Sequence, residues 1–186
     1  MTPEESLVLV TEKLESCGIP YMISGSFASS LHGVPRTTHD ADIIVEIDAA
    51  GVDRLSSLLH PEFYFDATMA RVAIRQRILF SAIHFDTGFK IDFIVRKNRP
   101  FSLSEFHRKM ETSFQGKLCW FSTPEDTILA KLEWSSKGQS ERQFNDALNI
   151  AKVQRERLDW AYLKSWVPEL NVKELFDRLV KDLAEA

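Results

Sequence analysis

The first part of the chain alternates between helical and strand-like patterns of hydrophobic residues. Leu7, Val10 and Leu14 recur at the spacing of one helix face, which predicts an amphipathic helix over residues 3–16. The run at 21–24 is short, apolar and rich in residues that favour strands, so it predicts the first strand. The chain therefore opens with a helix followed by a strand.

A helix of small residues and an alternating strand come next. Gly25-Ser26 opens a predicted helix over 27–32, and Gly33 closes it. Residues 41–47 alternate with a period of two, which predicts a strand with one face in the core. The following predictions are a helix at 49–59, a short strand and a helical or extended piece within 63–77, a hairpin of strands at 78–85 and 89–95, a helix at 102–110 and a strand at 118–121.

From Thr123 onward the pattern is helical throughout. Helix starts are predicted at Thr123, Asp159 and Asn171, where a capping residue precedes an apolar periodic run. We therefore expect an α+β fold. A small mixed β-sheet with flanking helices occupies residues 1–122, and a helical subdomain over 123–186 completes a cleft at their junction.

Composition narrows the class of protein. Of 186 residues, 44% are hydrophobic and 27% charged, which suits a folded chain with a substantial core. No apolar run approaches the roughly 18 residues that a membrane span needs, and the first residues are acidic where a secretory leader would be basic. We expect a cytoplasmic protein without a membrane partner. Cys17 and Cys119 lack metal-site or redox spacing, which favours buried free thiols.

Charge is unevenly distributed along the sequence. The net charge of −4 argues against coating nucleic acid by bulk charge alone. Residues 1–70 carry 3 basic and 11 acidic side chains, residues 71–117 carry 10 and 4, and residues 118–186 carry 10 and 12. An acidic N-terminal part followed by a basic central part suits a site where metal-binding carboxylates lie near phosphates. Solvated surfaces also produce such runs of charge.

Three acids fall on two predicted strands. Asp40 and Asp42 are two residues apart, so both leave the same strand face and can converge on one or two cations. Asp92 interrupts the apolar run Lys90–Val95, where an unpaired carboxylate would be costly. Either a shared metal ion or exposure of that sheet face to water explains these acids.

A phosphate-binding turn is predicted shortly before the paired acids. Backbone N–H groups at a helix start bind phosphate oxygens; Gly25 permits close approach, and the Ser26 hydroxyl adds a donor. Arg36, between this helix and the acidic strand, either contacts phosphate or forms a surface ion pair. Carboxylates for Mg²⁺ and a turn for a triphosphate together predict a nucleotide site.

These residues resemble a known superfamily. Gly25-Ser26, the pair Asp40-x-Asp42 and the later Asp92 are similar to the motifs of nucleotidyltransferases with the DNA polymerase β fold. The segments 23–42 and 123–132 resemble, more narrowly, the small bacterial nucleotidyltransferase-like proteins grouped with AbiEii toxins. The resemblance spans about residues 5–180.

The resemblance implies a Mg²⁺-dependent, or Mn²⁺-dependent, transfer of a nucleoside monophosphate from an NTP to an acceptor hydroxyl on RNA such as tRNA, on protein or on a small molecule. Asp40 and Asp42 would bind both metal ions, and Asp92 would hold the catalytic ion and help deprotonate the acceptor. Gly25 and Ser26 match the phosphate turn. Lys131 matches a lysine that reaches the triphosphate, although helical spacing alone would also fit a solvated residue. A toxin–antitoxin or phage-defence role with a cognate antitoxin would follow.

Two other interpretations remain open. His39-Asp40 forms the doublet of HD-type metal phosphohydrolases, with His32 as a further ligand, but that class carries its doublet in a helix whereas a strand is predicted here. A non-catalytic member of the same fold, binding a nucleotide or a partner, is the other alternative.

Overall fold

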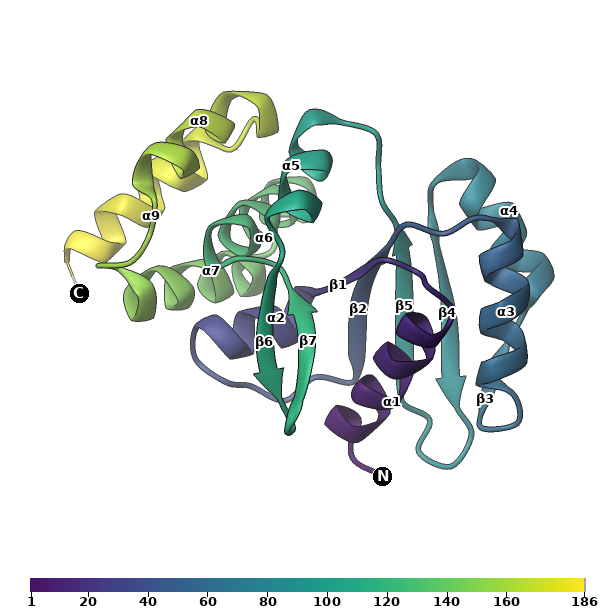
Figure 1. Ribbon diagram of the computed structural model, residues 1–186. Coiled ribbons are helices and arrows are strands. Elements are labelled where there is room, and N and C mark those ends of the chain that lie inside the picture. Colours follow the sequence, from purple (N-terminus) through teal and green to yellow (C-terminus); the bar gives the residue numbers. More distant parts are fainter. Residues whose placement is uncertain (186) are drawn as a thin grey trace. The chain divides into compact units, whose positions relative to one another are not determined.

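The computed structural model describes residues 1–185, and their contacts divide into two units (Figure 1). The sheet unit comprises 1–24 and 38–121, and the helical unit comprises 25–37 together with the chain from Ser122 onward. The helix that follows the first strand thus groups with the C-terminal helices. The boundary expected between residues 122 and 123 stays a prediction.

The sheet unit holds a seven-stranded mixed sheet in the order β3-β4-β5-β2-β1-β7-β6. Strands β2 and β5 pair in parallel, as do β1 and β7, while the other neighbours are antiparallel. This confirms the predicted mixed sheet flanked by helices. Its elements are α1 (Pro3–Ser16), β1 (Tyr21–Ser24), β2 (Asp40–Val45), α3 (Ala49–Leu59), β3 (Phe63–Phe65), α4 (Ala67–Gln76), β4 (Leu79–His84), β5 (Lys90–Val95), α5 (Pro100–Arg108), β6 (Met110–Phe114) and β7 (Lys117–Phe121).

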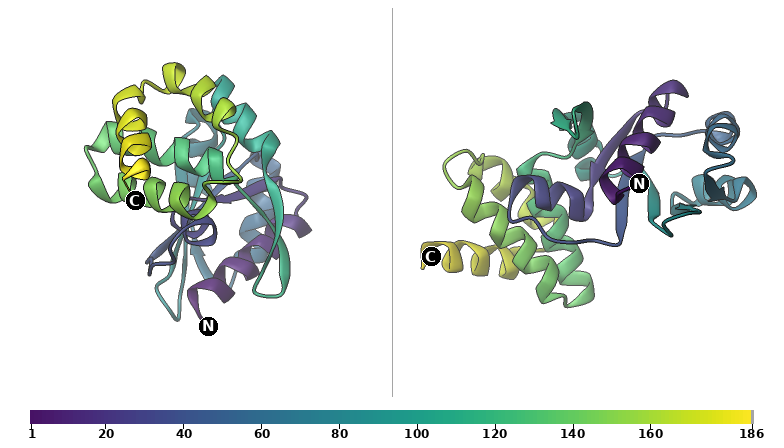
Figure 2. Two further views of the ribbon diagram at one scale, coloured as in Figure 1. Left: turned by 90° about the vertical axis from the view of Figure 1, so that its left-hand side faces the viewer. Right: turned by 90° about the horizontal axis from the view of Figure 1, so that it is seen from below.

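Strand alternation places the core of this unit on one sheet face. Ala41, Ile43 and Val45 of β2 are fully buried, whereas Asp40 and Asp42 point the other way. On the neighbouring strands, the rings of Phe80 and Phe93 stack with their centroids 5.1 Å apart. Helix α3 lies beside α4 (Figure 2) and also contacts α1. The apolar face is therefore closed by helices.

The helical unit contains α2 (Gly25–His32), α6 (Pro124–Gly138), α7 (Glu141–Gln154), α8 (Trp160–Leu170) and α9 (Lys173–Ala184). Helix α2 packs against both α6 and α7. The close approach is visible at Gly33, where an added Cβ would lie 3.0 Å from the backbone nitrogen of Ile150 on α7. Two segments nearly ninety residues apart along the chain thus form one helical cluster.

Most predicted elements are confirmed, including the hairpin of β4 and β5 and the helix starts at Thr123 and Asp159, whose side chains accept hydrogen bonds from the N–H groups of Asp126 and Tyr162. The predicted helix start at Asn171 is wrong. Asn171 ends α8 in the left-handed conformation (φ 54°), and α9 begins after Val172 without a side-chain cap.

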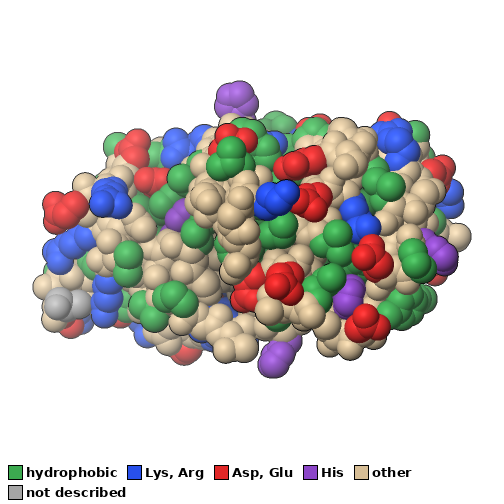
Figure 3. Space-filling view, turned by 60° about the horizontal axis from the view of Figure 1, so that its bottom comes forward, with side chains coloured by type: hydrophobic (Ala, Val, Ile, Leu, Met, Phe, Trp, Pro, Cys, Tyr) green, Lys and Arg blue, Asp and Glu red, His purple; other side chains and the backbone are tan. Residues whose placement is uncertain are grey.

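Within residues 1–185 no helix is long and apolar enough to span a membrane. Both cysteines are buried free thiols, as the sequence predicts. On the face drawn in Figure 3, acidic and basic side chains are interspersed.

Candidate functional site

The three predicted catalytic acids lie on the sheet face opposite the apolar core. Along one row across four strands, Ser24 of β1, Asp42 of β2, Asp92 of β5 and Ser81 of β4 stand directly opposite one another. Residues that pair in register project to the same side of a sheet. Asp42 and Asp92, fifty residues apart in sequence, are therefore nearest neighbours on adjacent parallel strands.

An apolar row bounds the polar one on one side. Met22, Ile44 and Ile94 occupy the next level on the same three strands, and Phe106 of α5 packs against them. Helix α5 begins with Pro100 at its first turn, a position where the missing N–H is not needed. Through Phe106, this helix covers the apolar row of the site face.

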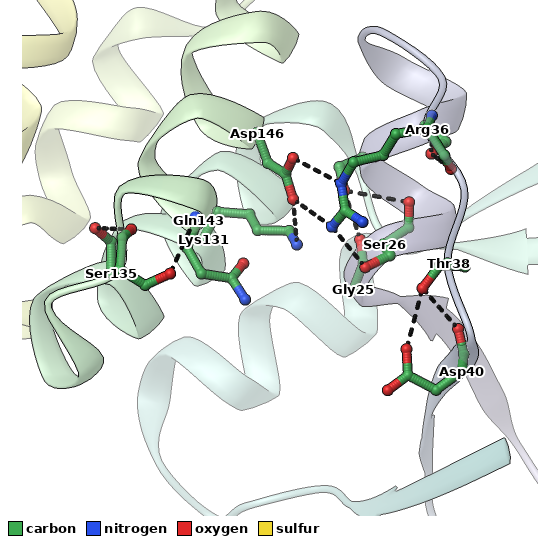
Figure 4. Close-up of polar contacts among 12 residues, drawn as sticks. Gly25, Ser26, Arg36, Thr38, Asp40, Lys131, Ser135, Gln143 and Asp146 are labelled. Atoms are coloured by element: carbon green, nitrogen blue, oxygen red, sulfur yellow. Dashed lines mark hydrogen bonds and ion pairs between the residues drawn. The ribbon is translucent and has the colours of Figure 1, made fainter. Parts of the chain in front are cut away.

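The row on the other side carries the remaining acid and a lysine. Asp40 of β2 lies opposite Lys90 of β5, which lies opposite Ile83 of β4 and, beyond it, Tyr64 of β3. The Thr38 hydroxyl donates a hydrogen bond of 3.0 Å to the Asp40 carboxylate (Figure 4). All three acids thus belong to two adjacent rows of one sheet face.

Asp92 is the most enclosed of the three acids and both of its oxygens are engaged. The Ser81 hydroxyl donates to Oδ1 at 2.5 Å, and the Lys90 ammonium lies 2.6 Å from Oδ2. A buried carboxylate without such partners would cost several kcal/mol, so these two residues stabilise the charge of Asp92. The interruption of an apolar strand by an acid is therefore explained by local pairing.

Lys90 is the cation of this face. Its hydrogen bond to Asp92 raises the pKa of its ammonium more than burial lowers that pKa, and the charges of Asp92, Asp40 and Asp42 raise it further. The ammonium therefore stays charged at neutral pH. The charge of the Lys90 ammonium interacts favourably with the charges of all three acids.

The donor chemistry of the acids fits a hard divalent cation, since Mg²⁺ and Mn²⁺ take carboxylate oxygens. Within residues 1–185, no three histidine, cysteine or acidic side chains are grouped so that they could hold a metal ion as they stand. The assignment of Asp40, Asp42 and Asp92 as ligands of such an ion stays a prediction.

In the helical unit, the predicted phosphate turn lies at the start of α2. Gly25 adopts a φ of +58°, a conformation that favours glycine, and α2 begins directly from it. The Ser29 hydroxyl donates to the Gly25 carbonyl at 2.9 Å, which fixes the first turn. Unpaired N–H groups at such a start attract anions.

Arg36 and Lys131, both predicted to contact phosphate, converge on one further residue that the sequence did not indicate, Asp146 of α7 (Figure 4). The Arg36 guanidinium donates from Nε to Oδ1 of Asp146 at 3.0 Å and from Nη2 to Oδ2 at 2.8 Å. The ammonium of Lys131 donates to Oδ2 at 2.9 Å, and Arg36 also donates to the Ser26 hydroxyl at 2.9 Å.

Burial of Asp146 raises the pKa of its carboxyl, but the hydrogen bonds and the charges of Arg36 and Lys131 together outweigh burial, so the pKa lies below its ordinary value. One carboxylate thus holds two cations, leaving the group of Arg36, Lys131 and Asp146 with a net positive charge. Lys131 is buried, with only 5% of its side chain exposed, so it is not a solvated residue. Arg36 forms an ion pair that is partly buried.

Neither candidate histidine supports a phosphohydrolase centre. Asp40 is the first residue of strand β2 and His39 directly precedes it, whereas the hydrolase class carries its doublet in a helix. His32 is buried in the helical unit with its Nε2 2.7 Å from the Ser122 carbonyl, and burial lowers its pKa despite that hydrogen bond and the nearby Glu125. Because a carbonyl only accepts, Nε2 carries a proton and is unavailable to a metal ion.

No protein-family model and no curated protein matches this chain, but solved structures do. An antigenic nucleotidyltransferase-like protein from Paracoccidioides brasiliensis matches with a TM-score of 0.57 and 17% identity, over 95% of this chain and 91% of that one. The antibiotic-resistance factor ANT(2'')-Ia matches with a TM-score of 0.55 and 12% identity, over 98% and 93%. The lincosamide antibiotic adenylyltransferase LnuA, in its lincomycin-bound crystal structure, matches with a TM-score of 0.54 and 12% identity, over 82% and 98%.

These matches span nearly the whole of both partners at low identity, so they concern the path of the backbone. They agree with the broad resemblance carried by Gly25-Ser26, Asp40-x-Asp42 and Asp92, while the narrower resemblance to the AbiEii group stays a prediction. The chain has the fold of nucleotidyltransferase-like proteins.

Proposed function

We propose that this protein is a metal-dependent nucleotidyltransferase that moves a nucleoside monophosphate from an NTP to an acceptor hydroxyl. The observation that carries the proposal is the register of Asp42 opposite Asp92, with Asp40 on the same sheet face, in a fold that nucleotidyltransferase-like proteins share. Three carboxylates on one sheet face repel one another, and a bound cation offsets that repulsion. Metal binding gives them a use.

In this proposal the three acids of the sheet face bind the metal ion. Asp40, Asp42 and Asp92 would hold Mg²⁺ or Mn²⁺, which when bound neutralises the charge that develops on the phosphate oxygens. In this proposal Asp92 receives the proton of the acceptor hydroxyl. Its hydrogen bond from Ser81 fixes the orientation of its carboxylate for that task.

Within the helical unit itself, several groups are suited to phosphate binding. The N–H groups at the start of α2, the Ser26 hydroxyl and the cations of Arg36 and Lys131 are donors of the type that bind a triphosphate. Asp146 orients the two cations and keeps them from repelling each other. This anchoring lowers the entropy that the side chains lose when phosphate binds.

The reaction conserves its atoms as a simple displacement. The acceptor oxygen forms a bond to the α-phosphorus, and the bond from that phosphorus to the bridging oxygen of the β-phosphate breaks. The proton of the hydroxyl passes to Asp92 and then to solvent. Pyrophosphate leaves with the electron pair of the broken bond and the negative charge.

Apolar residues beside the acids favour a small-molecule acceptor. Tyr64 (55% exposed), Leu79 (53%) and Ile83 (37%) lie on the same sheet face as Asp92. An acceptor with an apolar surface next to its hydroxyl would cover them, whereas a nucleic-acid backbone would not. The lincomycin-bound state of the structural neighbour LnuA supports the same acceptor class.

The test is transfer of label from each α-labelled NTP in the presence of Mg²⁺. The acceptors are total RNA, a protein extract, and a panel of hydroxyl compounds that includes lincomycin. Asp42→Asn should lower the rate at least about 100-fold, because a metal ligand is lost. Asp53→Asn, which changes an exposed acid on α3 of the same unit, serves as the matched control and should keep the wild-type rate.

The alternatives give different products. A non-catalytic binder would bind Mg²⁺–NTP in calorimetry yet release no pyrophosphate with any acceptor. A phosphohydrolase would yield free nucleotide without a labelled acceptor. Labelling that persists at full rate in Asp42→Asn would remove the acids from the reaction.

A further inference from the structure

We infer that Lys90 acts as a built-in cation of the acidic row, and that a divalent metal ion binds there by displacing its ammonium from Asp92. The inference rests on the proposed function, since it concerns the same three acids. It adds a residue that controls metal affinity. Two features of Lys90, its place in the sheet and its charge, support it.

Register places Lys90 among the acids rather than at the periphery. It is directly opposite Asp40 on the parallel strand β2, and it precedes Asp92 by two residues, so all three project from the same face. The ammonium lies 2.6 Å from Oδ2 of Asp92. It therefore occupies the oxygen that a metal ion would need.

The charges explain why the lysine and a metal ion compete. Three carboxylates on adjacent rows repel one another, and one ammonium relieves only part of that repulsion. A divalent ion relieves more of it and accepts several oxygens at once. Both cations satisfy the same electrostatic need, so occupation by one lowers the affinity for the other.

Lys90 can leave without disturbing the fold. Its side chain is 42% exposed, whereas that of Asp92 is only 9% exposed. A long flexible stem allows the ammonium to swing into water once Asp92 has another partner. Meanwhile Ser81 continues to hold Oδ1 of Asp92. The exchange therefore needs the rearrangement of one side chain.

The test is a Mn²⁺ titration of the full chain, followed by the electron paramagnetic resonance signal of free Mn²⁺. Lys90→Met keeps the apolar stem and removes the charge, and Lys90→Gln keeps a hydrogen-bond donor for Asp92. We expect both variants to bind Mn²⁺ about tenfold more tightly than the wild type, because the competing cation is gone. The matched control is Lys117→Met, which removes a lysine of strand β7 that pairs with Glu12 of α1. This variant should bind Mn²⁺ as the wild type does.

A second measurement separates this role from simple loss of folding. In EDTA, the urea midpoint of Lys90→Met should fall, since the acids lose their cation, and saturating Mn²⁺ should restore it. The inference is overturned if neither Lys90 variant binds Mn²⁺ more tightly than the wild type, while Asp42→Asn abolishes binding. If Asp42→Asn binds Mn²⁺ as well as the wild type does, or if no form binds it, the metal assignment in the proposed function fails as well.

Discussion

The carboxylate of Asp146 meets the guanidinium of Arg36 through two parallel hydrogen bonds, one to each oxygen, at 3.0 and 2.8 Å. This two-point geometry is the strongest that an arginine and a carboxylate form. Lys131 adds a third hydrogen bond to the same carboxylate. Asp146 therefore links α6, α7 and the segment after α2 at a single buried point.

Replacing Asp146 by Asn should destabilise the helical unit. The variant leaves the charges of Arg36 and Lys131 in a buried place without their counter-anion, which costs about 3 kcal/mol. Urea unfolding followed by tryptophan fluorescence measures the loss, since Trp134, Trp160 and Trp166 belong to this unit.

Glu141→Gln is the matched control for Asp146→Asn. Glu141 lies on the same helix and also pairs bidentately with an arginine, Arg178, but both partners are exposed. We expect a much smaller loss of stability, because an exposed ion pair contributes little in water. Equal losses in the two variants would contradict the view that burial makes the Asp146 cluster important.

The sequence indicated the candidate site residues more readily than it indicated the residues that contact them. The period-two pattern of 41–47 placed Asp40 and Asp42 on one face, and the same reasoning applied to Asp92. Lys90 was within reach of that argument, because it precedes Asp92 by two residues and shares its face. Asp146 was not, because 110 residues separate it from Arg36 and only tertiary packing joins them.

Two local elements were misjudged for local reasons. Strand β6 was missed because Met110–Phe114 carries no buried residue and so lacks a marked alternation, and its pairing with β7 defines it instead. The helix start at Asn171 was wrong because a capping residue that tolerates the left-handed conformation also ends helices. The strongly periodic helices, such as α1, followed from the sequence directly.

Gly25 and Gly138 should respond oppositely to alanine. Gly25 holds a φ of +58°, where an L-residue is strained, so Gly25→Ala should lower the free energy of unfolding by roughly 1–2 kcal/mol. Gly138 ends α6, and a Cβ added there would meet nothing within 4 Å. Gly138→Ala should raise stability by up to about 1 kcal/mol.

Both glycine variants are measured by urea unfolding of the helical unit. If Gly25→Ala were as stable as the wild type, the left-handed conformation of residue 25 at the start of α2 would be contradicted, because an alanine is strained there. Under the proposed function, Gly25→Ala should also weaken NTP binding in calorimetry, whereas Gly138→Ala should leave binding unchanged.

His32 should make the helical unit sensitive to mild acid. Burial lowers the pKa of His32 below its ordinary value of 6.5. Between the folded and unfolded pKa values the unfolded chain binds the extra proton, so stability is greatest above about pH 6.5 and falls as the pH is lowered through that window. His32→Gln offers an amide donor for the Ser122 carbonyl without a titrating group.

The measurement is the free energy of unfolding from pH 8 to pH 5 in the wild type and in His32→Gln. The wild type should lose stability more steeply toward pH 5 than the variant does. Parallel curves would show that His32 does not carry the acid sensitivity, and a steeper curve for the variant would reverse the predicted sign.

The two buried thiols should report on the sheet unit alone. Cys17 and Cys119 both lie in this unit, and burial raises the pKa of each thiol, with Arg54 partly offsetting it at Cys17. The thiolate is the reactive form, so both should react with a disulfide reagent at least about 100-fold more slowly than in urea.

Cys119 is the more protected of the two, with 1% of its surface exposed against 7% for Cys17, and its sulfur lies 3.7 Å from the Thr11 hydroxyl. In Cys17→Ser, the labelling rate of Cys119 should therefore rise only at the urea concentration where the sheet unit unfolds. Trp120 is the one tryptophan of that unit, so its fluorescence in a Trp134→Phe, Trp160→Phe, Trp166→Phe background gives the matching transition. Labelling that precedes this transition would mean that β7 opens before the rest of the sheet.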